Sequence, residues 1–467
     1  MTTTEYDLIV IGAGAVGENV ADRAVQGGLT ALIIESELVG GECSYWACMP
    51  SKALIRSGMA VRAAQKVGGA REAVTGKLDA LATFARRNTI IHNWDDESQV
   101  DWLKGAKIDL ARGHGVITGV KEVTVGDTVY TARHAVCVST GSAALLPDIP
   151  GLKDSKPWTS RDATSAQSAP ESLAIIGGGV VAVEMATAYA SFGTRVTVLS
   201  RGGLLAGQEP FAGELVEKSL TELGATIQLN VSPRAVSKAN GSFVIELDNG
   251  NSVTADELLV ATGRVPRSSD LGLENIGLTP GDWLDVDDTM KVTGFDWLYA
   301  TGDINHRVLL THQGKYQARA AGDVIVARAL GKPVHDNAWG AHVATGDHEA
   351  VPQVTFSDPE VASVGLTAAA AEKAGYDIRV VDYDLSWLAG TAIQADDYTG
   401  KARMVVDEKR RVILGVTFVG QDVSEMLQAA TFAVVGEIPL DRLWHGVPAY
   451  PTMNEIWLRL LETYGRP

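Results

Sequence analysis

Two of the three cysteines in this 467-residue chain lie within one short segment, Gly41-Glu42-Cys43-Ser44-Tyr45-Trp46-Ala47-Cys48-Met49-Pro50-Ser51-Lys52. On a regular helix, a spacing of five residues would place Cys43 and Cys48 about 140° apart around the axis and ~7.5 Å apart along it. A disulfide needs Cα atoms within roughly 4.4–6.8 Å of each other, so the backbone must tighten here into a turn or a distorted helix start. The pair is a candidate redox-active disulfide.

The residues around the pair are compatible with such a turn. Gly40 and Gly41 supply backbone freedom upstream, and Pro50 suits an early position in a helix. A thiolate near a helix N-terminus has a lowered pKa, which suits a sulfur that must attack and leave. Two alternatives stay open: inert buried thiols, or half of a metal site. A zinc site needs about four ligands and only Cys137 remains, so we expect no bound metal.

A dinucleotide-binding fingerprint precedes the cysteines. The segment 7–11, in which residues 8–11 are apolar, predicts a buried parallel strand, and it leads directly into a Gly-x-Gly-x-x-Gly sequence and an Ala-rich helix. Such glycines allow a tight turn and the close approach of a pyrophosphate to the helix N-terminus. Glu35 follows a second predicted strand, 30–34, and its carboxylate can hold a ribose 2′-hydroxyl. The three glycines are Gly12, Gly14 and Gly17.

The fingerprint recurs in the second third of the chain, where a predicted strand leads into a turn containing Gly177 and Gly179. Two such units predict two dinucleotide sites. Ser200 lies 23 residues after Gly177, just as Glu35 lies 23 residues after Gly12, and Arg201 follows it. Replacing the acid by Ser and Arg removes a charge that would repel a 2′-phosphate and supplies a cation to bind it. The second site is predicted to prefer NADPH over NADH, and the first to hold a nucleotide with an unmodified ribose, such as FAD. The alternative is that Arg201 is only an exposed loop charge.

Composition and charge exclude several classes of protein. The chain has 46% hydrophobic residues and a net charge of −17, and no Lys/Arg-rich tract offsets the acidity, which argues against nucleic acid as a partner. No stretch approaches the ~18 apolar residues of a membrane helix. The N-terminal region has no basic segment, and its apolar run is too short for a signal peptide. Three cysteines are too few for a secreted disulfide scaffold, so we expect a cytoplasmic protein that acts away from membranes.

The remaining segments complete the organisation. Residues 53–104 carry helical patterning, and we expect the charges around Arg86, Arg87, Asp95 and Asp96 to be solvated. Cys137 lies in an apolar strand and is expected to be a small core residue. The last third of the chain alternates strands and helices, which predicts an α+β module with an antiparallel sheet.

Together these motifs resemble the flavoprotein disulfide reductase family, the class I pyridine nucleotide-disulfide oxidoreductases, which includes dihydrolipoamide dehydrogenase, glutathione reductase and mercuric reductase. The similarity runs the full length. It rests on both fingerprints, Gly-Gly-Glu-Cys with Cys-Met-Pro-Ser-Lys, Ala-Thr-Gly-Arg at 261–264, Ala-Thr-Gly-Asp at 300–303, and the segment 356–365. It implies an α/β fold with two Rossmann-like dinucleotide-binding domains and an α+β C-terminal dimerisation domain. The implied boundaries are 1–150 for the FAD-binding domain with the cysteines, 151–267 for the NAD(P)H-binding domain, 268–345 for the return to the FAD-binding and central region, and 346–467 for the interface domain.

The resemblance further implies FAD in the first site, NAD(P)H in the second, and a homodimer. Cys48 would face the flavin as a thiolate, and Cys43 would be the thiol that meets the substrate. Lys52 and Glu184 match the family's ion pair beside the flavin, and Asp303 matches the residue that touches its ribityl chain. The other positions expected to bind cofactor are Gly115, Thr140, Gly141, Gly263 and Thr311.

One departure from the family affects the expected acceptor. Many members have His-Pro-Thr followed by Glu, and that His, from the partner subunit, moves protons to and from the thiol. This chain has Tyr450 in place of the His, with Glu455 downstream. A phenol with a pKa near 10 is a poor general base at pH 7. Mercuric reductases also have Tyr before Pro-Thr, but they receive metal on C-terminal cysteines that are absent from the last residues of this chain.

The predicted activity is therefore an enzymatic transfer of electrons from NADPH through FAD and the Cys43–Cys48 bridge to a small-molecule or small-disulfide acceptor. The main alternative is reduction of a quinone, a metal ion or another electrophile that needs less proton management. A non-catalytic redox sensor is a separate, third hypothesis.

Overall fold

The computed structural model describes residues 3–466, which form two compact units. Of these residues, the first unit combines 3–50 with 88–145 and 263–347, and the second combines 51–87, 146–262 and 348–466. The four-segment division expected from the family resemblance stays a prediction. Across residues 3–466, no helix has both the length and the apolar character needed to cross a membrane.

A seven-stranded sheet is the centre of the first unit. Its strand order is β3-β2-β1-β6-β5-β4, with β16 also paired to β6. Strands β1, β2, β3, β6 and β16 run parallel to one another, whereas β5 pairs antiparallel with β6, and β4 pairs antiparallel with β5. The strands are β1 (Thr3–Ile11), β2 (Ala31–Glu35), β3 (Asp109–Arg112), β4 (Val116–Gly119), β5 (Glu122–Val125), β6 (Thr128–Val138) and β16 (Leu298–Ala300). Cys137 is fully buried in β6, which confirms its expected place in the core.

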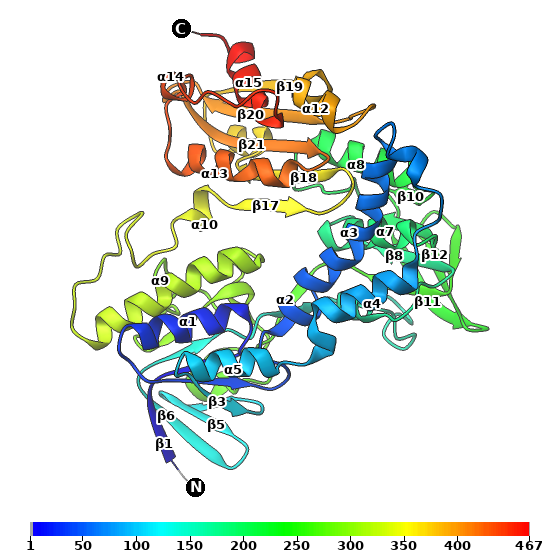
Figure 1. Cartoon of the computed structure of the whole chain (residues 1–467). Helices are drawn as coiled ribbons and strands as arrows, with labels where there is room; N and C mark the ends of the chain where they lie inside the picture. Colours follow the sequence, from blue (N-terminus) through cyan, green and yellow to red (C-terminus); the bar gives the residue numbers. More distant parts are fainter. Residues whose placement is uncertain (1–2, 467) are drawn as a thin grey trace. The chain divides into compact units, whose positions relative to one another are not determined.

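Two helices pack side by side on this sheet, α1 (Ala15–Gln26) and α9 (Thr311–Ala329) (Figure 1). Gly322 allows their close approach, because a Cβ there would lie 2.5 Å from the Cβ of Arg23 and 3.0 Å from the carbonyl oxygen of Val20. The first unit also contains α2 (Gly41–Tyr45), α5 (Glu97–Gly105) and the two-stranded sheet of β7 (Ser142–Ala144) and β15 (Arg264–Pro266).

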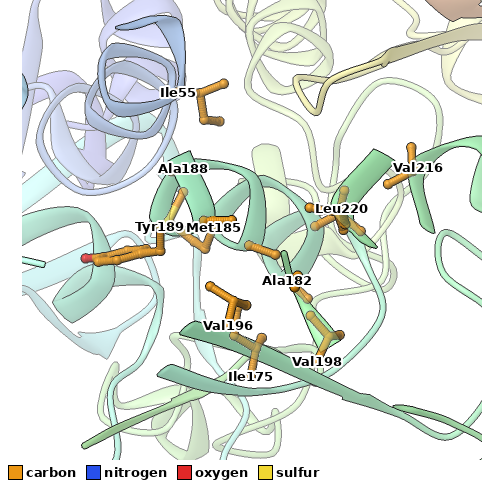
Figure 2. Packing of buried hydrophobic residues seen from close by; sticks show 14 of the residues in the cluster. Ile55, Ile175, Ala182, Met185, Ala188, Tyr189, Val196, Val198, Val216 and Leu220 are labelled. Carbon is orange, nitrogen blue, oxygen red and sulfur yellow. The ribbon is translucent and has the colours of Figure 1, made fainter. Parts of the chain in front are cut away.

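The second fingerprint belongs to a parallel sheet in the second unit, with the order β10-β9-β8-β14. Figure 2 shows Ala182, Met185 and Tyr189 of its helix α7 packed among buried residues that include Ile175 and Val196 of the sheet. This shared apolar core holds α7 in place against the strands of the sheet. The elements are β8 (Ser172–Ile176), α7 (Val180–Ser191), β9 (Arg195–Ser200), α8 (Pro210–Glu222), β10 (Thr226–Leu229) and β14 (Glu257–Val260).

The last third of the chain forms a five-stranded antiparallel sheet, in the order β17-β18-β21-β20-β19, which confirms the predicted α+β module (Figure 1). Its strands are β17 (Pro352–Thr355), β18 (Glu360–Gly365), β19 (Ile378–Asp384), β20 (Lys401–Asp407) and β21 (Val412–Gly420). The helices of this region are α11 (Ala368–Lys373), α12 (Ala389–Gln394), α13 (Leu427–Val435), α14 (Leu440–Leu443) and α15 (Ile456–Tyr464). Elsewhere the chain forms α6 (Ser160–Ser165), β11 (Pro233–Ala239), β12 (Ser242–Leu247), β13 (Ser252–Ala255) and α10 (Gly346–Glu349).

The segment 53–104 is helical as predicted, with α3 (Cys48–Gln65), α4 (Ala80–Ile90) and α5, but the expectation that Arg87 is solvated is wrong. Arg87 is fully buried, and its guanidinium donates hydrogen bonds to the backbone carbonyls of Thr164 and Ala166. It also lies over the ring of Phe84, 5.5 Å from the ring centroid. The charge is tolerated in the core because carbonyl oxygens from a distant segment replace its water.

Candidate redox-active site

The chain tightens between the two cysteines, as their spacing requires. Cys43 lies in α2 and Cys48 begins α3, and the amides of Trp46 and Ala47 both donate to the carbonyl of Glu42, at 2.9 and 2.7 Å. The structure holds the pair as thiols rather than as a disulfide, each half-buried. Because a turn separates α2 from α3, the two cysteines are not held apart as they would be on one regular helix.

The two thiols differ in their electrostatic environments. The Sγ atom of Cys48 lies 3.3 Å from Oγ1 of Thr311, at the start of α9. The pKa of Cys43 is raised far above its ordinary value because its thiol hydrogen-bonds to Cys48 and because it is buried, while Thr311 and Lys315 act in the opposite direction. The direction of this shift favours the proton on Cys43 and the negative charge on Cys48 when the pair carries one proton.

An ion-pair network surrounds the residue that precedes the first cysteine. Glu42 lies 3.5 Å from a guanidinium nitrogen of Arg267 and 3.9 Å from one of Arg264. Nε of Arg264 donates to Oγ of Ser142 at 2.8 Å, and that hydroxyl donates to Oδ2 of Asp303 at 2.5 Å. Burial raises the pKa of Asp303, which this hydrogen bond partly offsets. Within the first unit, the network links Arg264, the last residue of the Ala-Thr-Gly-Arg motif, to Asp303, the last residue of the Ala-Thr-Gly-Asp motif.

The glycines of the first fingerprint are demanded by close backbone approaches. Gly12 has a φ of 103°, and a Cβ there would lie 2.5 Å from the carbonyl oxygen of Ser139. A Cβ on Gly17 would lie 2.0 Å from the carbonyl oxygen of Gly12. Gly14, by contrast, is the N-cap of α1, and no side chain caps the helix there. A Cβ on Gly14 would meet no atom closer than 4.0 Å, so open space faces the positive end of the helix, as a pyrophosphate requires.

Glu35 is the last residue of β2 and faces the same turn. Its Oε2 accepts a hydrogen bond from the amide of Ala13 at 2.8 Å, and Oε1 accepts one from the amide of Glu37 at 2.7 Å. Burial raises its pKa, and these amides oppose the shift. Each carboxylate oxygen retains a second lone pair, which could accept a ribose hydroxyl. The cradle around α1 and the acceptor at Glu35 thus fit a dinucleotide such as FAD.

The other positions predicted to bind cofactor in the first unit lie on strand ends and turns. A Cβ on Gly115 would lie 3.1 Å from a methyl group of Ile34, so a side chain there would press on β2. Thr140 donates to the carbonyl of Arg267 at 2.8 Å, and Gly141 has a φ of 72°. The carbonyl of Gly263 accepts from the amide of Leu145 at 2.9 Å, and both residues belong to the first unit.

The second fingerprint reproduces the geometry of the first, within the second unit. Gly177 has a φ of 134°, and a Cβ there would lie 2.3 Å from the carbonyl oxygen of Ala261. Gly179 is the uncapped N-cap of α7, and a Cβ there would meet no atom within 4 Å. Ser200 ends β9 just as Glu35 ends β2, and it is buried, whereas Arg201 is exposed. The exposed cation therefore follows directly after the position where the first unit has its acid.

Lys52 and Glu184 form an ion pair in the second unit, with 2.8 Å between Nζ and Oε2. Glu184 is buried on α7, and its Oε1 accepts a hydrogen bond from the amide of Phe356 at 3.0 Å. The ammonium of Lys52 also lies 5.0 Å from the centroid of the Phe356 ring. The Glu184 carboxylate therefore ties α3 and the strand β17 region to α7.

Tyr450 and Glu455 are not bonded to each other. The Tyr450 side chain is 74% exposed and forms no hydrogen bond with any residue in 3–466. Glu455 is buried and pairs with Arg459 at 2.5 Å, and its other oxygen, Oε2, has no hydrogen-bond partner among the described residues. The roles that we predicted for both residues stay predictions.

Three charged residues that interact with Glu35, Cys43 or Glu42 were not predicted from the sequence. Glu18, Lys315 and Arg267 carry no motif of their own. A signal existed for Lys315, since it follows Thr311 by one helical turn, and for Glu18, a lone acid on the buried face of α1. Within residues 3–466, no group of three or more His, Cys, Asp or Glu side chains is arranged to hold a metal ion.

The fold and the paired thiols define a flavoprotein disulfide oxidoreductase. The sequence profile described as pyridine nucleotide-disulphide oxidoreductase matches residues 6–321, and the dimerisation domain of the same family matches 351–460. The chain belongs to the pyridine nucleotide-disulphide oxidoreductase family, and it is accordingly an oxidoreductase that uses FAD and a pyridine nucleotide.

Named relatives cover nearly the whole chain. A dihydrolipoyl dehydrogenase from Geobacillus stearothermophilus is 30% identical over 98% of this chain and 96% of its own length. A mercuric reductase from Staphylococcus aureus is 29% identical over 97% of this chain and 81% of its own length. The solved structure of the HOCl-induced flavoprotein disulfide reductase RclA from Escherichia coli shares the fold, with a TM-score of 0.83 at 24% identity over 98% of this chain and 99% of RclA.

Proposed function

We propose that this protein passes electrons from NADPH, through FAD and the Cys43–Cys48 bridge, to a small second acceptor. The observation that carries the proposal is the geometry of the thiol pair, in which Cys43 and Cys48 lie half-buried on either side of one turn and Sγ of Cys48 lies 3.3 Å from Oγ1 of Thr311. FAD, when bound, would take up hydride from the pyridine nucleotide and deliver two electrons to the disulfide. The chain's own thiols then carry these electrons to the acceptor.

The two cysteines take different roles in this proposal. Cys48 is the sulfur that bears negative charge, and the Thr311 hydroxyl at the start of α9 stabilises it as a thiolate. Cys43 keeps a proton and attacks the acceptor after releasing it. Asp303, whose carboxyl group is held by Ser142, and Glu35 are the residues that we assign to hold the ribityl and ribose hydroxyls of FAD.

The preference for NADPH is supported by the end of β9. Ser200 carries no charge that would repel a 2′-phosphate, and the exposed Arg201 beside it can donate to phosphate oxygens. Gly179 and the uncapped start of α7 supply the space and the positive helix end for the pyrophosphate.

The nature of the acceptor depends on proton supply. Tyr450, exposed and without a hydrogen bond, is a poor substitute for an imidazole as a general base. This observation favours, as a second candidate function, the reduction of a quinone, a metal ion or another electrophile. We infer a homodimer from the matched dimerisation domain, in which Tyr450 would serve the partner's thiols.

An anaerobic assay of NADPH oxidation with a series of acceptors tests the proposal. The FAD-loaded protein is mixed with NADPH, and oxidation of NADPH is followed with lipoamide, glutathione disulfide, benzoquinone and Cu²⁺ in turn. We expect turnover with at least one acceptor, and loss of disulfide turnover in Cys43→Ser. A protein that binds NADPH but turns over with no acceptor would instead be a redox sensor.

A further inference from the structure

Glu18 has a buried carboxyl group, one oxygen of which has no hydrogen-bonding partner among the residues that the structure describes. It lies in the first turn of α1 and is 8% exposed, and its Oε1 has no partner among the described residues. Buried polar groups in native proteins are nearly always hydrogen-bonded, so this exception needs an explanation. The helix dipole favours negative charge at this end of α1, which does not offset the loss of water.

The charged groups around Glu18 come from the elements packed against α1. They are Lys315 on α9 and Glu35 at the end of β2. The charge of Glu18 also contributes to raising the pKa of Tyr45 on α2. Burial raises the pKa of Glu18 to about 7, Glu35 adds to the rise and Lys315 opposes it. Glu18 can therefore bind and release a proton near neutral pH.

Lys315 connects this carboxyl group to the thiols. It follows Thr311 by one turn of α9, so the two side chains share a helix face. Thr311 contacts Cys48, and the positive charge of Lys315 lowers the pKa of Cys43 as it lowers that of Glu18. Lys315 forms no salt bridge within residues 3–466, so its ammonium group is held neither by the Glu18 carboxylate nor by the thiol pair.

We propose that reduction of the Cys43–Cys48 bridge is coupled, through Lys315, to protonation of Glu18. Glu18 is then a positioning residue for the charge of Lys315 and an internal store for one proton. The inference rests on the proposed function in one respect, that this bridge is the electron carrier.

Electrons and protons balance as follows. The bridge takes two electrons, from NADPH by way of FAD, and one proton, so that the S–S bond breaks and leaves a thiol at Cys43 and a thiolate at Cys48. The new negative charge on Cys48 attracts the Lys315 ammonium. The Glu18 carboxylate then loses part of the stabilisation that this ammonium gives it, and it binds one proton from solvent. When a disulfide acceptor is reduced, its S–S bond breaks and the Cys43–Cys48 bond re-forms. Cys43 and Glu18 then release their two protons to the two departing thiolates. The same subunit thereby supplies a proton that Tyr450 is poorly suited to deliver.

The test is the pH dependence of the bridge's reduction equilibrium. The FAD-loaded protein is equilibrated at each pH with dithiothreitol couples of known potential, and the reduced fraction is measured by alkylating Cys43 and Cys48. Because dithiothreitol itself releases two protons when it is oxidised, the potential of each couple is calculated at each pH, and the result is expressed as the constant of the bridge's half-reaction at one fixed potential. That constant changes by about a hundredfold per pH unit when the bridge takes up two protons, and by about tenfold when it takes up one. We expect the steeper dependence just below pH 7 in the unmodified protein, and the tenfold dependence throughout in Glu18→Gln. Glu97→Gln, on the exposed start of α5, should behave as the unmodified protein.

Two further measurements test the proposal independently of Glu18→Gln. Lys315→Met should also abolish the steep segment, and infrared difference spectra of the unmodified protein should gain a protonated-carboxyl band on reduction. A tenfold dependence at every pH in the unmodified protein, or an unchanged steep segment in Glu18→Gln, would overturn the coupling. Because dithiothreitol reduces the bridge without NADPH, failure of the proposed function would show separately, as a bridge that NADPH leaves oxidised.

Discussion

The choice between NADPH and NADH should change when Arg201 is replaced by Gln. Hydrogen bonds to charged groups contribute about 1.5–3 kcal/mol. Arg201 is exposed at the end of β9, so solvent and salt screen its contact and place the value near the lower limit, about 1.5 kcal/mol. Loss of this contact corresponds to about a tenfold fall in the ratio of kcat/KM for NADPH to that for NADH. Ser200→Glu should lower the ratio further, because a carboxylate would repel the 2′-phosphate of NADPH and accept a hydrogen bond from the 2′-hydroxyl of NADH.

The assay is steady-state turnover with one fixed acceptor and each nucleotide, at low and at high ionic strength. Screening should shrink the difference between Arg201→Gln and the unmodified protein as salt increases. Arg195→Gln, an exposed arginine at the opposite end of β9, is the matched control and should leave the ratio unchanged. Equal kcat/KM for the two nucleotides in the unmodified protein, or an unchanged ratio in Arg201→Gln, would refute the assignment of Ser200 and Arg201 to the 2′-phosphate.

Three further predictions concern protons and thiols. Tyr450→His should raise lipoamide turnover by about tenfold or more, the lower end of the general acid–base range, while benzoquinone turnover stays nearly constant and Tyr450→Phe gains nothing; equal gains with both acceptors would count against a proton-transfer role. Because the folded protein raises the pKa of Glu18 from 4.5 to about 7, it binds more protons than the unfolded chain between these values, so its stability falls as the pH rises through them. Denaturant unfolding should therefore find Glu18→Gln more stable than the unmodified protein by up to about 3 kcal/mol at pH 8 and by little at pH 4.5, and an equal difference at both pH values would contradict the assignment. After anaerobic reduction, Cys43→Ser should keep the long-wavelength absorption of a thiolate beside the flavin and Cys48→Ser should lose it; the reverse pattern would exchange the two roles.

Local sequence patterns were sufficient for the features that depend on local geometry. Each fingerprint combines a buried strand, glycines that admit close backbone contacts and an uncapped helix start. Because these features lie within a few residues of one another, the spacing of the glycines was enough to place Gly12 and Gly177 on equivalent turns. Counting from these glycines also placed Glu35 and Ser200, each of which ends a strand. The antiparallel sheet of the last third followed from its alternating strands.

Features that depend on long-range packing were missed. Arg87 has the pattern of a surface charge, and only the carbonyls of Thr164 and Ala166, nearly eighty residues later, make its burial tolerable. Lys315 and Glu18 lie almost three hundred residues apart in the sequence and are brought together because α1 packs on α9. No local period encodes such neighbours, since they depend on which helices share a face of the sheet.

The central claim is that NADPH delivers electrons to the Cys43–Cys48 bridge, and thiol labelling tests it most directly. The oxidised, FAD-loaded protein is treated anaerobically with NADPH, quenched with an alkylating reagent under denaturing conditions, and mapped by mass spectrometry against a sample without NADPH. Cys137, which is buried in β6 and belongs to no disulfide, is labelled in both samples and serves as the internal standard. We predict that Cys43 and Cys48 become labelled together, and only after NADPH. Flavin that is reduced by NADPH while both cysteines stay unlabelled would contradict the claim.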